Sequence, residues 1–290
     1  MGSCAPITHV IVTGSTGLLG RAVLQAAPVM LPGVEVRELC SARHGGVDLC
    51  DEAACERLLR ECPLPHPQGT VLLHCAADIS WTGQAVVENN FRMAVNTARW
   101  ARQSGVAFSV CVSSVSVFEP GSRISMESPC LPRTPYGMGK LAAEFAWRAL
   151  LEPDRQGIVR LAGLLGWQRE PAMFWNRLLK RAAEDGKGET PESEFNPAST
   201  RNYLTAPEAA RCLLRVAMGH HADIHLAAGA GAVTALEFMR RLEQLRDAPL
   251  PAVSGAPVDD VILYEPSPLV RPWLMPWEAS LEELWEQRPA

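Results

Sequence analysis

Short apolar runs alternate with amphipathic stretches through the first two-thirds of the chain. The run at residues 71–76 is continuous, as expected for a strand that a parallel sheet buries on both faces. Similar runs predict further strands at residues 10–13, 34–39, 46–49, 106–112 and 158–161. The stretches between them predict helices at residues 18–27, 51–60, 86–103 and 136–150, the second of which Asp51 is expected to cap. This alternation predicts an α/β fold with a Rossmann-type, doubly wound parallel sheet and right-handed crossovers.

The amino-acid composition of the chain changes after about Gly166. Tryptophans and prolines become frequent there, and residues 184–193 form a polar stretch. We interpret this part as a small, irregular C-terminal lobe over the carboxyl edge of the sheet, and we expect a helix at residues 206–218 to return to the main domain. The predicted domains are a nucleotide-binding domain of residues 1–165 and 204–226, and a substrate-binding lobe of residues 166–203 and 227–290.

Length and composition allow one large domain with a smaller lobe. The chain has 290 residues, of which 47% are hydrophobic and 20% are charged, values typical of a soluble globular protein. Its net charge of −5 gives no basic field for a nucleic acid, so we expect no such partner. No signal segment is visible, and no apolar run approaches the ~18 residues of a membrane span. We therefore expect a cytoplasmic protein with no membrane partner.

Cysteines and histidines give no sign of a disulfide framework or of a metal site. The nine cysteines are scattered, odd in number and without a Cys-x-x-Cys pair, which fits reduced thiols, several of them in the core. The histidines show no zinc-ligand spacing. Their nearest approach to a cluster is His220, His221 and His225, and we expect no metal there.

A glycine turn follows the first predicted strand. Residues 11–20 read as an apolar strand that runs into Gly14, Gly17 and Gly20. Glycine permits a tight turn and lets bare backbone N–H groups approach a pyrophosphate at a helix N-terminus. Such turns also serve as plain connectors between a strand and a helix, so the turn alone does not decide the function.

Tyr136 and Lys140 supply groups for acid–base chemistry. On a helix their spacing places both on one face, and Pro135 indicates that Tyr136 lies near the helix start. A free tyrosine titrates near ~10, so work at neutral pH requires a neighbouring positive charge, which Lys140 can supply together with hydrogen bonds to ribose hydroxyls. The alternative is a surface helix that carries an aromatic residue and a solvated lysine.

Two serines directly follow the strand predicted at residues 106–112. Ser113 and Ser114 come at the carboxyl edge, where a doubly wound sheet builds its site. A serine there could bond to a substrate oxygen and orient it beside the tyrosine. The alternative is that these hydroxyls only cap loose backbone groups.

Taken in order, these motifs resemble the extended branch of the short-chain dehydrogenase/reductase superfamily, the epimerase/dehydratase-like branch. Thr13-Gly-Ser-Thr-Gly17-Leu-Leu-Gly20 is similar to its Thr-Gly-x-x-Gly-x-x-Gly element. Ser114-Val-Ser-Val-Phe118 is similar to its Ser-x-x-Val-Tyr, which selects Ser114 over Ser113 as the catalytic hydroxyl. The resemblance covers most of residues 7 to 215 and fades beyond.

The resemblance also implies which residues form the site. Catalysis is expected from Ser114, Tyr136 and Lys140. His74-Cys-Ala-Ala77 resembles the strand end that lines the cofactor, and Val47-Asp48-Leu49 resembles the segment that contacts adenine. The expected cofactor contacts are Gly14, Thr16, Gly17, Leu18, Leu19, Gly20, Asp48, Leu49, Cys75, Ala76, Ala77, Asn89, Tyr136 and Lys140.

The end of the second strand bears on the choice of cofactor. An acidic residue there receives the ribose 2′-hydroxyl of NAD, whereas a nearby arginine accommodates the 2′-phosphate of NADP. Here the acidic position falls on Cys40, and Arg43 follows in the loop, with Ser41 as a further donor. We predict NADP(H). NAD(H) remains the alternative cofactor. If the predicted register of the second strand is shifted, Glu38 faces the ribose and Arg43 is a solvated loop residue.

Three functions fit these residues. The leading one is a reductase in which hydride passes from the nicotinamide to a small-molecule carbonyl, with Tyr136 as the proton donor. The second is a nucleotide-sugar epimerase or dehydratase that retains its cofactor. The third is a non-catalytic cofactor-binding regulator, as some relatives that resemble the regulatory subunit of methionine adenosyltransferase are. Relatives that act on sugars often carry an asparagine after the arginine strand, and residues 160–166 have none.

The substrate lobe is the least informative part of the sequence. Ser80, Trp81, Arg201 and Tyr203 are candidate substrate contacts. Arg201 resembles a diphosphate ligand, or it forms a structural ion pair with Glu208 or Glu237. The aromatic residues of the lobe either form its core or line a pocket for a hydrophobic substrate; they are Trp167, Phe174 and Trp175, with Met173 beside them. Family members often dimerise through the Tyr/Lys helix, so we expect a homodimer.

Overall fold

The computed structural model describes residues 6–80, 83–168, 173–184, 196–250 and 258–289. The chain divides into two compact units. The first unit comprises Met1–Pro120, Ser128–Leu161 and Ala209–His225, and the second comprises Gly121–Glu127, Ala162–Glu208 and Leu226–Ala290. The sequence did not single out the short segment Gly121–Glu127, which belongs to the second unit. Each unit is built around strands and helices of its own.

The first unit is organised around a six-stranded sheet in the order β10-β6-β4-β3-β1-β2. Its strands are β1 His9–Thr13, β2 Glu35–Leu39, β3 Thr70–His74, β4 Phe108–Ser114, β6 Gln156–Leu161 and β10 Asp223–Ala227. The pairs from β2 through β6 run parallel. Every residue of β3, β4 and β6 is buried, which explains their apolar sequences. The predicted doubly wound sheet is confirmed.

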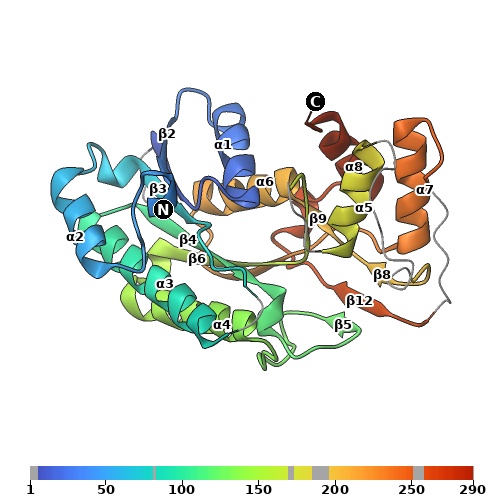
Figure 1. Ribbon diagram of the computed structural model, residues 1–290. Helices are drawn as coiled ribbons and strands as arrows, with labels where there is room; N and C mark the ends of the chain where they lie inside the picture. The colour runs from blue at the N-terminus through green and yellow to red at the C-terminus, as the bar shows by residue number, and fades with distance from the viewer. Residues whose placement is uncertain (1–5, 81–82, 169–172, 185–195, 251–257, 290) are drawn as a thin grey trace. The chain divides into compact units, whose positions relative to one another are not determined.

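Helices cover both faces of this sheet. Figure 1 shows α3 and α4 on one face and α1 and α6 on the other. The helices of the unit are α1 Leu18–Met30, α2 Glu52–Glu61, α3 Gln84–Ser104, α4 Pro135–Leu150 and α6 Ala206–Met218. Asp51 caps α2, as predicted, by accepting the Ala53 N–H. Among the described helices of the chain, none is both long and apolar enough to cross a lipid bilayer.

Two strand assignments need correction. Residues 46–49 are not a strand but a loop that follows the short helix η1 (Ala42–His44). Gly45 takes a left-handed backbone conformation at φ +77°, and the carbonyl and side chain of Asp48 accept the N–H groups of Asp51 and Cys50. These bonds form a turn into α2 rather than a ladder. The remaining strand of the sheet is β10, whose polar residues Asp223 and His225 interrupt the apolar run.

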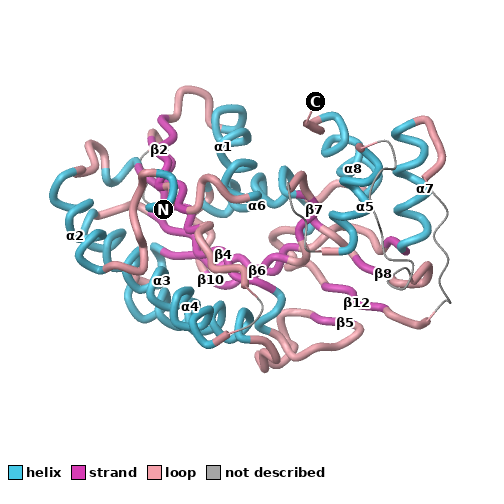
Figure 2. Tube along the Cα trace, in the orientation of Figure 1, coloured by secondary structure: helices cyan, strands magenta, loops and turns pink. Residues whose placement is uncertain are grey.

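The described residues of the second unit form short strands and three α-helices. One sheet has the order β11-β8-β12-β5, and β7 pairs with β9. The strands are β5 Arg123–Ile124, β7 Leu164–Leu165, β8 Thr200–Arg201, β9 Leu204–Thr205, β11 Val233–Thr234 and β12 Val261–Tyr264, and the helices are α5 Phe174–Ala183, α7 Ala235–Arg246 and α8 Trp277–Glu286. Figure 2 shows how short these strands are beside the loops of the unit.

An aromatic core holds the second unit together. Trp175 is buried, and its ring lies 4.4 Å from the Tyr203 ring and 5.0 Å from the Phe238 ring, centroid to centroid. Trp167 and Phe174 pack against the same cluster. Of the two interpretations of these aromatic residues, the core is therefore the one that the structure supports.

The sheet order of the first unit places a switch point between β1 and β3. From β1 the chain passes to β2 on one side, and the next strand, β3, pairs with β1 on the other side. In open α/β sheets the crevice outside the carboxyl ends of such strands is where ligands bind. The glycine turn follows β1 and Cys75-Ala-Ala77 follows β3, so both predicted cofactor segments lie at this edge.

Candidate active site

The glycine turn is packed tightly against the end of β3. Gly14 has φ +67°, and a Cβ there would lie 2.7 Å from the Cα and N of Ala76. A Cβ at Gly20 would lie 2.2 Å from the Gly14 carbonyl oxygen. Both glycines are therefore required by the packing of strand, turn and helix.

Gly17 has a different surrounding. It is the N-cap residue of α1, and a Cβ there would approach only the Gly14 carbonyl oxygen, at 3.2 Å. The first turn of α1 carries no acidic side chain and receives no side-chain cap. Its leading N–H groups therefore suit an anion. The hydroxyl of Ser15 is buried without a hydrogen-bond partner among the described residues, so these residues fit a bound pyrophosphate.

Thr13 and His74 join the ends of β1 and β3. The Thr13 hydroxyl bonds to His74 Nδ1 at 2.9 Å and accepts the Ala76 N–H at 3.2 Å. His74 is buried and stacks on Trp147, with 5.3 Å between ring centroids. Burial, together with the charge of Lys140, lowers the pKa of His74 to about 3. The imidazole is therefore neutral near pH 7 and acts as a fixed support for the turn.

The segment expected to contact adenine lies against α3. Leu49 is buried, and its carbonyl accepts the Asn96 side chain at 2.9 Å. The Cys50 thiol contacts the backbone oxygen of Asn89 at 3.8 Å, and the Asn89 amide donates to Asp78 at 2.9 Å. The structure thus brings together the loop that carries Asp48 and the helix that carries Asn89.

Ser114 ends β4 and caps the short helix η3 (Val115–Val117). Its hydroxyl accepts the Ser116 N–H and donates to the Ser116 hydroxyl, both at 3.1 Å. The capping role considered from the sequence is therefore present. The neighbouring Ser113 hydroxyl instead donates to Glu144 at 2.5 Å. Successive strand residues point to opposite faces, so only one of the two serines serves this buried contact, and Ser114 stays the predicted catalytic hydroxyl.

Tyr136 lies in the first turn of α4, and Lys140 follows one turn later. Thr134 caps this helix by accepting the Gly137 N–H at 3.0 Å, and Pro135 is its first residue. Lys140 is only 3% exposed, so it is not a solvated surface lysine. Its charge acts on His74, Cys75 and Cys111, so the ammonium group lies near β3 and β4.

The thiols beside Lys140 stay protonated. Burial raises the pKa of both Cys75 and Cys111 to about 12, and the charge of Lys140 offsets this only in part. Cys75 is therefore no nucleophile near pH 7. As a predicted cofactor contact it offers a neutral, compact side chain next to the glycine turn.

A buried ion pair below the serine strand was missed by the sequence reasoning. Arg160 of β6 and Glu144 of α4 are 5% and 3% exposed, and they form a two-pronged pair at 2.9 and 2.7 Å. Burial lowers the pKa of Arg160, but the bonds and charge of Glu144 outweigh this and raise it. The signal was available: an arginine inside an apolar strand needs a partner.

Arg201, a predicted substrate contact, is engaged within the second unit. Its guanidinium bonds to both carboxylate oxygens of Asp260 at 2.9 Å and to the Asp260 carbonyl at 2.8 Å. The predicted ion pair of Arg201 with Glu208 or Glu237 is wrong. Glu208 accepts the Met275 N–H, and Glu237 closes the capping box of α7 with Thr234. The structural alternative for Arg201 is thus present, with a different partner.

The other predicted substrate contacts divide among three surroundings. Tyr203 packs against Trp175 in the core of the second unit, and burial strongly raises its pKa. Ser80 is exposed, and its N–H bonds to Asp78 at 3.0 Å. Trp81 lies outside the described residues, as does the Arg43 side chain, although the Arg43 backbone belongs to η1.

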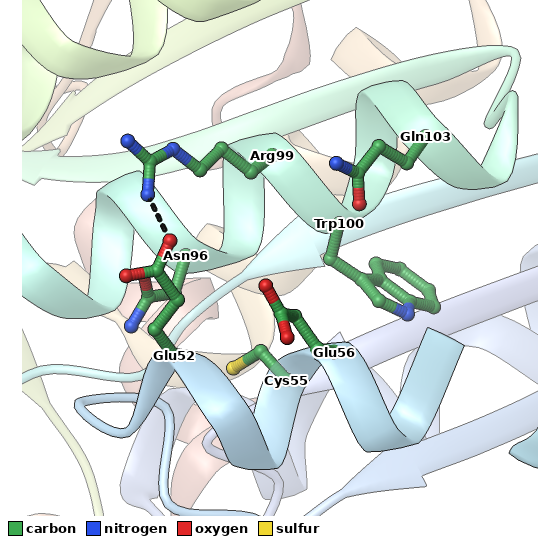
Figure 3. Close-up of a pocket in the computed structure, with 7 residues that line it drawn as sticks. All are labelled: Glu52, Cys55, Glu56, Asn96, Arg99, Trp100 and Gln103. Carbon is green, nitrogen blue, oxygen red and sulfur yellow. Dashed lines mark hydrogen bonds and ion pairs between the residues drawn. The ribbon is translucent and has the colours of Figure 1, made fainter. Parts of the chain in front are cut away.

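A small pocket between α2 and α3 is separate from these residues. Figure 3 shows it lined by Glu52, Cys55, Glu56, Asn96, Arg99, Trp100 and Gln103. Arg99 bridges its rim through an ion pair with Glu52 at 2.5 Å. Its volume of about 30 Å³ suits a few water molecules rather than a nucleotide.

Comparison with protein families gives one match. A model described as the NAD dependent epimerase/dehydratase family matches residues 10–227. A search of curated proteins by sequence gives no significant match.

Solved structures share the fold at low sequence identity. A dTDP-4-dehydrorhamnose reductase from Bacillus anthracis in complex with NADP is 16% identical, with 97% of this chain and 100% of that chain covered and a TM-score of 0.76. A UDP-glucuronic acid 4-epimerase from Bacillus cereus with NAD is 19% identical, with coverages of 96% and 97% and a TM-score of 0.73. A dTDP-glucose 4,6-dehydratase from Bacillus anthracis with NAD is 15% identical, with coverages of 97% and 96% and a TM-score of 0.76.

Proposed function

Because this chain belongs to the NAD dependent epimerase/dehydratase family, we propose that it is an NADP(H)-dependent oxidoreductase of the extended short-chain dehydrogenase/reductase type, which reduces a small-molecule carbonyl. The observation that supports catalysis most directly is the burial of Lys140 one helical turn after Tyr136. Burying an ammonium group is costly unless a hydrogen-bonding or charged partner compensates for the lost solvation. A protein that only bound the cofactor would have no need of this arrangement.

Each residue has a distinct part in the proposed reaction. The glycine turn and the N-terminus of α1 hold the pyrophosphate, and the nicotinamide, when bound, supplies the hydride. Ser114 donates a hydrogen bond to the carbonyl oxygen and orients it. Tyr136 delivers the proton to that oxygen, and the positive charge of Lys140 favours the phenolate that results.

The proposed preference for NADP(H) rests on the end of β2. Cys40 occupies the position where an acidic residue would receive a ribose hydroxyl, and its thiol lies 3.5 Å from the His44 carbonyl. Arg43 lies within η1, the short helix that follows β2. A guanidinium there would pair with a 2′-phosphate. Glu38 is exposed on β2 and keeps NAD(H) as the alternative.

A nucleotide-sugar epimerase or dehydratase is the second candidate. Structures of such enzymes are among those that share this fold. Against it, the Arg201 guanidinium is already bonded to Asp260, so a diphosphate would have to compete with or share an existing partner. A reductase exchanges its cofactor in every turnover, whereas an epimerase regenerates it in place.

The state of the cofactor in purified protein distinguishes the two candidates. Near-ultraviolet absorbance of retained, reduced nicotinamide would support the epimerase, whereas cofactor-free protein that oxidises added NADPH with a carbonyl compound supports the reductase. Thermal-shift screening of UDP-sugars against aromatic carbonyl compounds gives the substrate class. A strong shift with a UDP-sugar alone would overturn the reductase. Cofactor binding without any turnover of either class would instead support a regulatory protein.

We further propose that the protein acts in the cytoplasm as a homodimer. The helices α3 and α4 present large exposed apolar side chains, namely Phe91, Met138 and Phe145, and a second copy would cover them. Sedimentation of wild-type protein and of the Phe145→Glu variant tests this. We expect a dimer that the substitution weakens; a wild-type monomer at all concentrations would overturn it.

A further inference from the structure

We propose that Arg160 is a positioning residue whose ion pair neutralises Glu144, so that the charge of Lys140 acts on Tyr136 instead of on Glu144. This inference rests on the proposed role of Tyr136 as the proton donor. It assigns a function to a buried ion pair.

The pair uses both carboxylate oxygens of Glu144. Arg160 Nε donates to Oε1 at 2.9 Å and a terminal nitrogen donates to Oε2 at 2.7 Å. The Ser113 hydroxyl also donates to Oε1, at 2.5 Å. With its acceptor sites engaged in the interior, the carboxylate is held by β4 and β6 and has little capacity for another cation.

Helix geometry brings Glu144 close to the catalytic residues. Tyr136, Lys140 and Glu144 follow one another at intervals of four residues on α4, and so they share one face. Cys111 of β4 experiences both the charge of Lys140 and the charge of Glu144, so both charges face the same strand. Without Arg160, an unpaired carboxylate would lie one helical turn from the ammonium group and would compete with Tyr136 for it.

Other groups around Lys140 contribute little charge at neutral pH. His74 of β3 is neutral because its pKa is lowered, and Cys75 and Cys111 are protonated because their pKa values are raised. On α3, which packs along α4, Glu88 and Arg92 pair with each other at 2.5 Å on the surface.

Further charged or titratable groups lie near these elements. Asp78 is bonded by Asn89, Arg133 pairs with Glu119 in the loop before α4, and Cys130 of that loop lies against Arg160. Arg148 of α4 is exposed. Glu144 is therefore the buried carboxylate, among the described residues, that can oppose Lys140.

Arg160 also ties together both sides of the site. Its guanidinium lies over the Phe118 ring, 4.7 Å from the centroid, and Phe118 follows the segment that begins at Ser114. Cys130 precedes α4 and interacts with the same guanidinium. A single buried cation thus contacts the serine side and the tyrosine side of the proposed site.

The tyrosine content of the chain allows a test that needs no substrate. The chain has three tyrosines, and burial raises the pKa values of Tyr203 and Tyr264. Near-ultraviolet difference absorbance of the cofactor-free protein follows tyrosinate formation as the pH rises. The step that is missing from the Tyr136→Phe variant is the step of Tyr136.

The two charges of the pair must move this step in opposite directions. Arg160→Gln leaves a buried negative charge and should raise the midpoint, whereas Glu144→Gln leaves a positive charge and should lower it. The rise of eight residues separates Tyr136 and Glu144 by about 12 Å, so each shift should be on the order of one pH unit at low ionic strength. The double variant should return to the wild-type midpoint.

Gln156→Leu provides the matched control. Gln156 is buried on the same strand as Arg160 and donates to the Leu151 carbonyl at 3.4 Å. Its substitution disturbs the core without changing the charge, so its midpoint should equal that of the wild type. Circular dichroism over the titrated range verifies that each variant is folded. Should one single variant not fold, the difference between the other and the double variant carries the same test of sign.

The outcomes separate this inference from the proposed function. Equal midpoints, or shifts in the same direction, in folded variants would overturn the inference and reduce the pair to a structural role. Opposite shifts with a Tyr136→Phe variant that retains turnover would support the electrostatic inference and overturn the proposed proton donor. Opposite shifts with loss of turnover in that variant support both.

Discussion

Gly14 and Ala76 lie so close that a Cβ on Gly14 would be 2.7 Å from the Ala76 Cα. This contact joins the turn after β1 to the chain after β3, at the switch point of the sheet. The edge that is expected to hold the cofactor is therefore fixed by backbone packing, before any ligand binds.

Substitutions of two glycines in the turn should affect folding and cofactor binding differently. Gly14→Ala should cost more than about 2 kcal/mol of unfolding free energy, because it adds a clash to a left-handed backbone. Gly17→Ala meets only one backbone oxygen, at 3.2 Å, so it should fold normally and yet bind NADPH weakly. Thermal unfolding and NADPH fluorescence measure the two effects.

Gly33→Ala is the control for this pair. Gly33 has φ +84° but open space around it, so its substitution should cost about 1 kcal/mol and leave NADPH binding unchanged. Normal NADPH affinity in Gly17→Ala would contradict the proposed pyrophosphate site.

His74 should make the protein sensitive to acid. Its pKa is about 3 in the folded state, against an ordinary value of 6.5, because burial and Lys140 disfavour the charged ring. Between these values the unfolded chain binds more protons, so stability falls as the pH drops through this range and levels off below about pH 3. The slope attributable to His74 is at most about 1.4 kcal/mol per pH unit.

The His74→Asn variant should lose this part of the pH dependence. Urea unfolding at a series of pH values between about 4 and 7 measures the slope. His220→Asn serves for comparison, since burial lowers the pKa of His220 as well but its ring is less enclosed, and a smaller change is expected. An unchanged slope in the His74 variant would show that the ring is not buried as a neutral group.

Arg43 should determine the preference between the two nicotinamide cofactors. Arg43→Ala should weaken NADP+ binding by about tenfold, the loss of one charge-assisted contact to a phosphate, and should leave NAD+ binding unchanged. Arg60→Ala removes an exposed arginine of α2 that pairs with Glu56 and should alter neither affinity. Wild-type protein that binds NAD+ at least about tenfold more tightly than NADP+ would contradict the preference itself.

The pair of Arg201 and Asp260 should act as a structural unit. Burial raises the pKa of Asp260, but bonds from Ser199 and Arg201 outweigh this and lower it. The stability that this carboxylate contributes is therefore present above its ordinary pKa and is lost as the pH falls through the lowered value. Asp260→Asn should cost at most about 1 kcal/mol at neutral pH, because the pair is partly exposed.

The Arg201→Gln variant distinguishes structure from substrate binding. It should lower stability by a similar amount without changing the thermal response to UDP-sugars. If a UDP-sugar stabilises the wild type and no longer stabilises this variant, the second candidate function gains the diphosphate ligand that it requires.

Much of the first unit could be predicted from local sequence. The apolar runs of β3, β4 and β6 are buried on both faces, and such burial leaves its signature in the sequence itself. The helix at residues 206–218 was predicted with the bounds of α6. Capping by Asp51 was also correct, because a cap depends on residues only two or three positions away.

The failures concern contacts that span long stretches of chain. The pairing of Glu144 with Arg160, and that of Arg201 with Asp260, depends on which elements meet in space, and no spacing in the sequence encodes it. Residues 46–49 look apolar enough for a strand, but two glycines and the Asp48 turn direct their backbone bonds elsewhere. β10 is partly polar, and its place beside β6 makes it a strand.

The proposed function depends above all on Tyr136 as the proton donor in carbonyl reduction. The most direct measurement compares wild type and Tyr136→Phe for NADPH binding and for NADPH oxidation with the carbonyl compound that the wild type reduces. We expect unchanged binding and a rate lowered by about a hundredfold or more, the usual contribution of a positioned acid. A Tyr136→Phe variant that binds NADPH and keeps the full rate would contradict it.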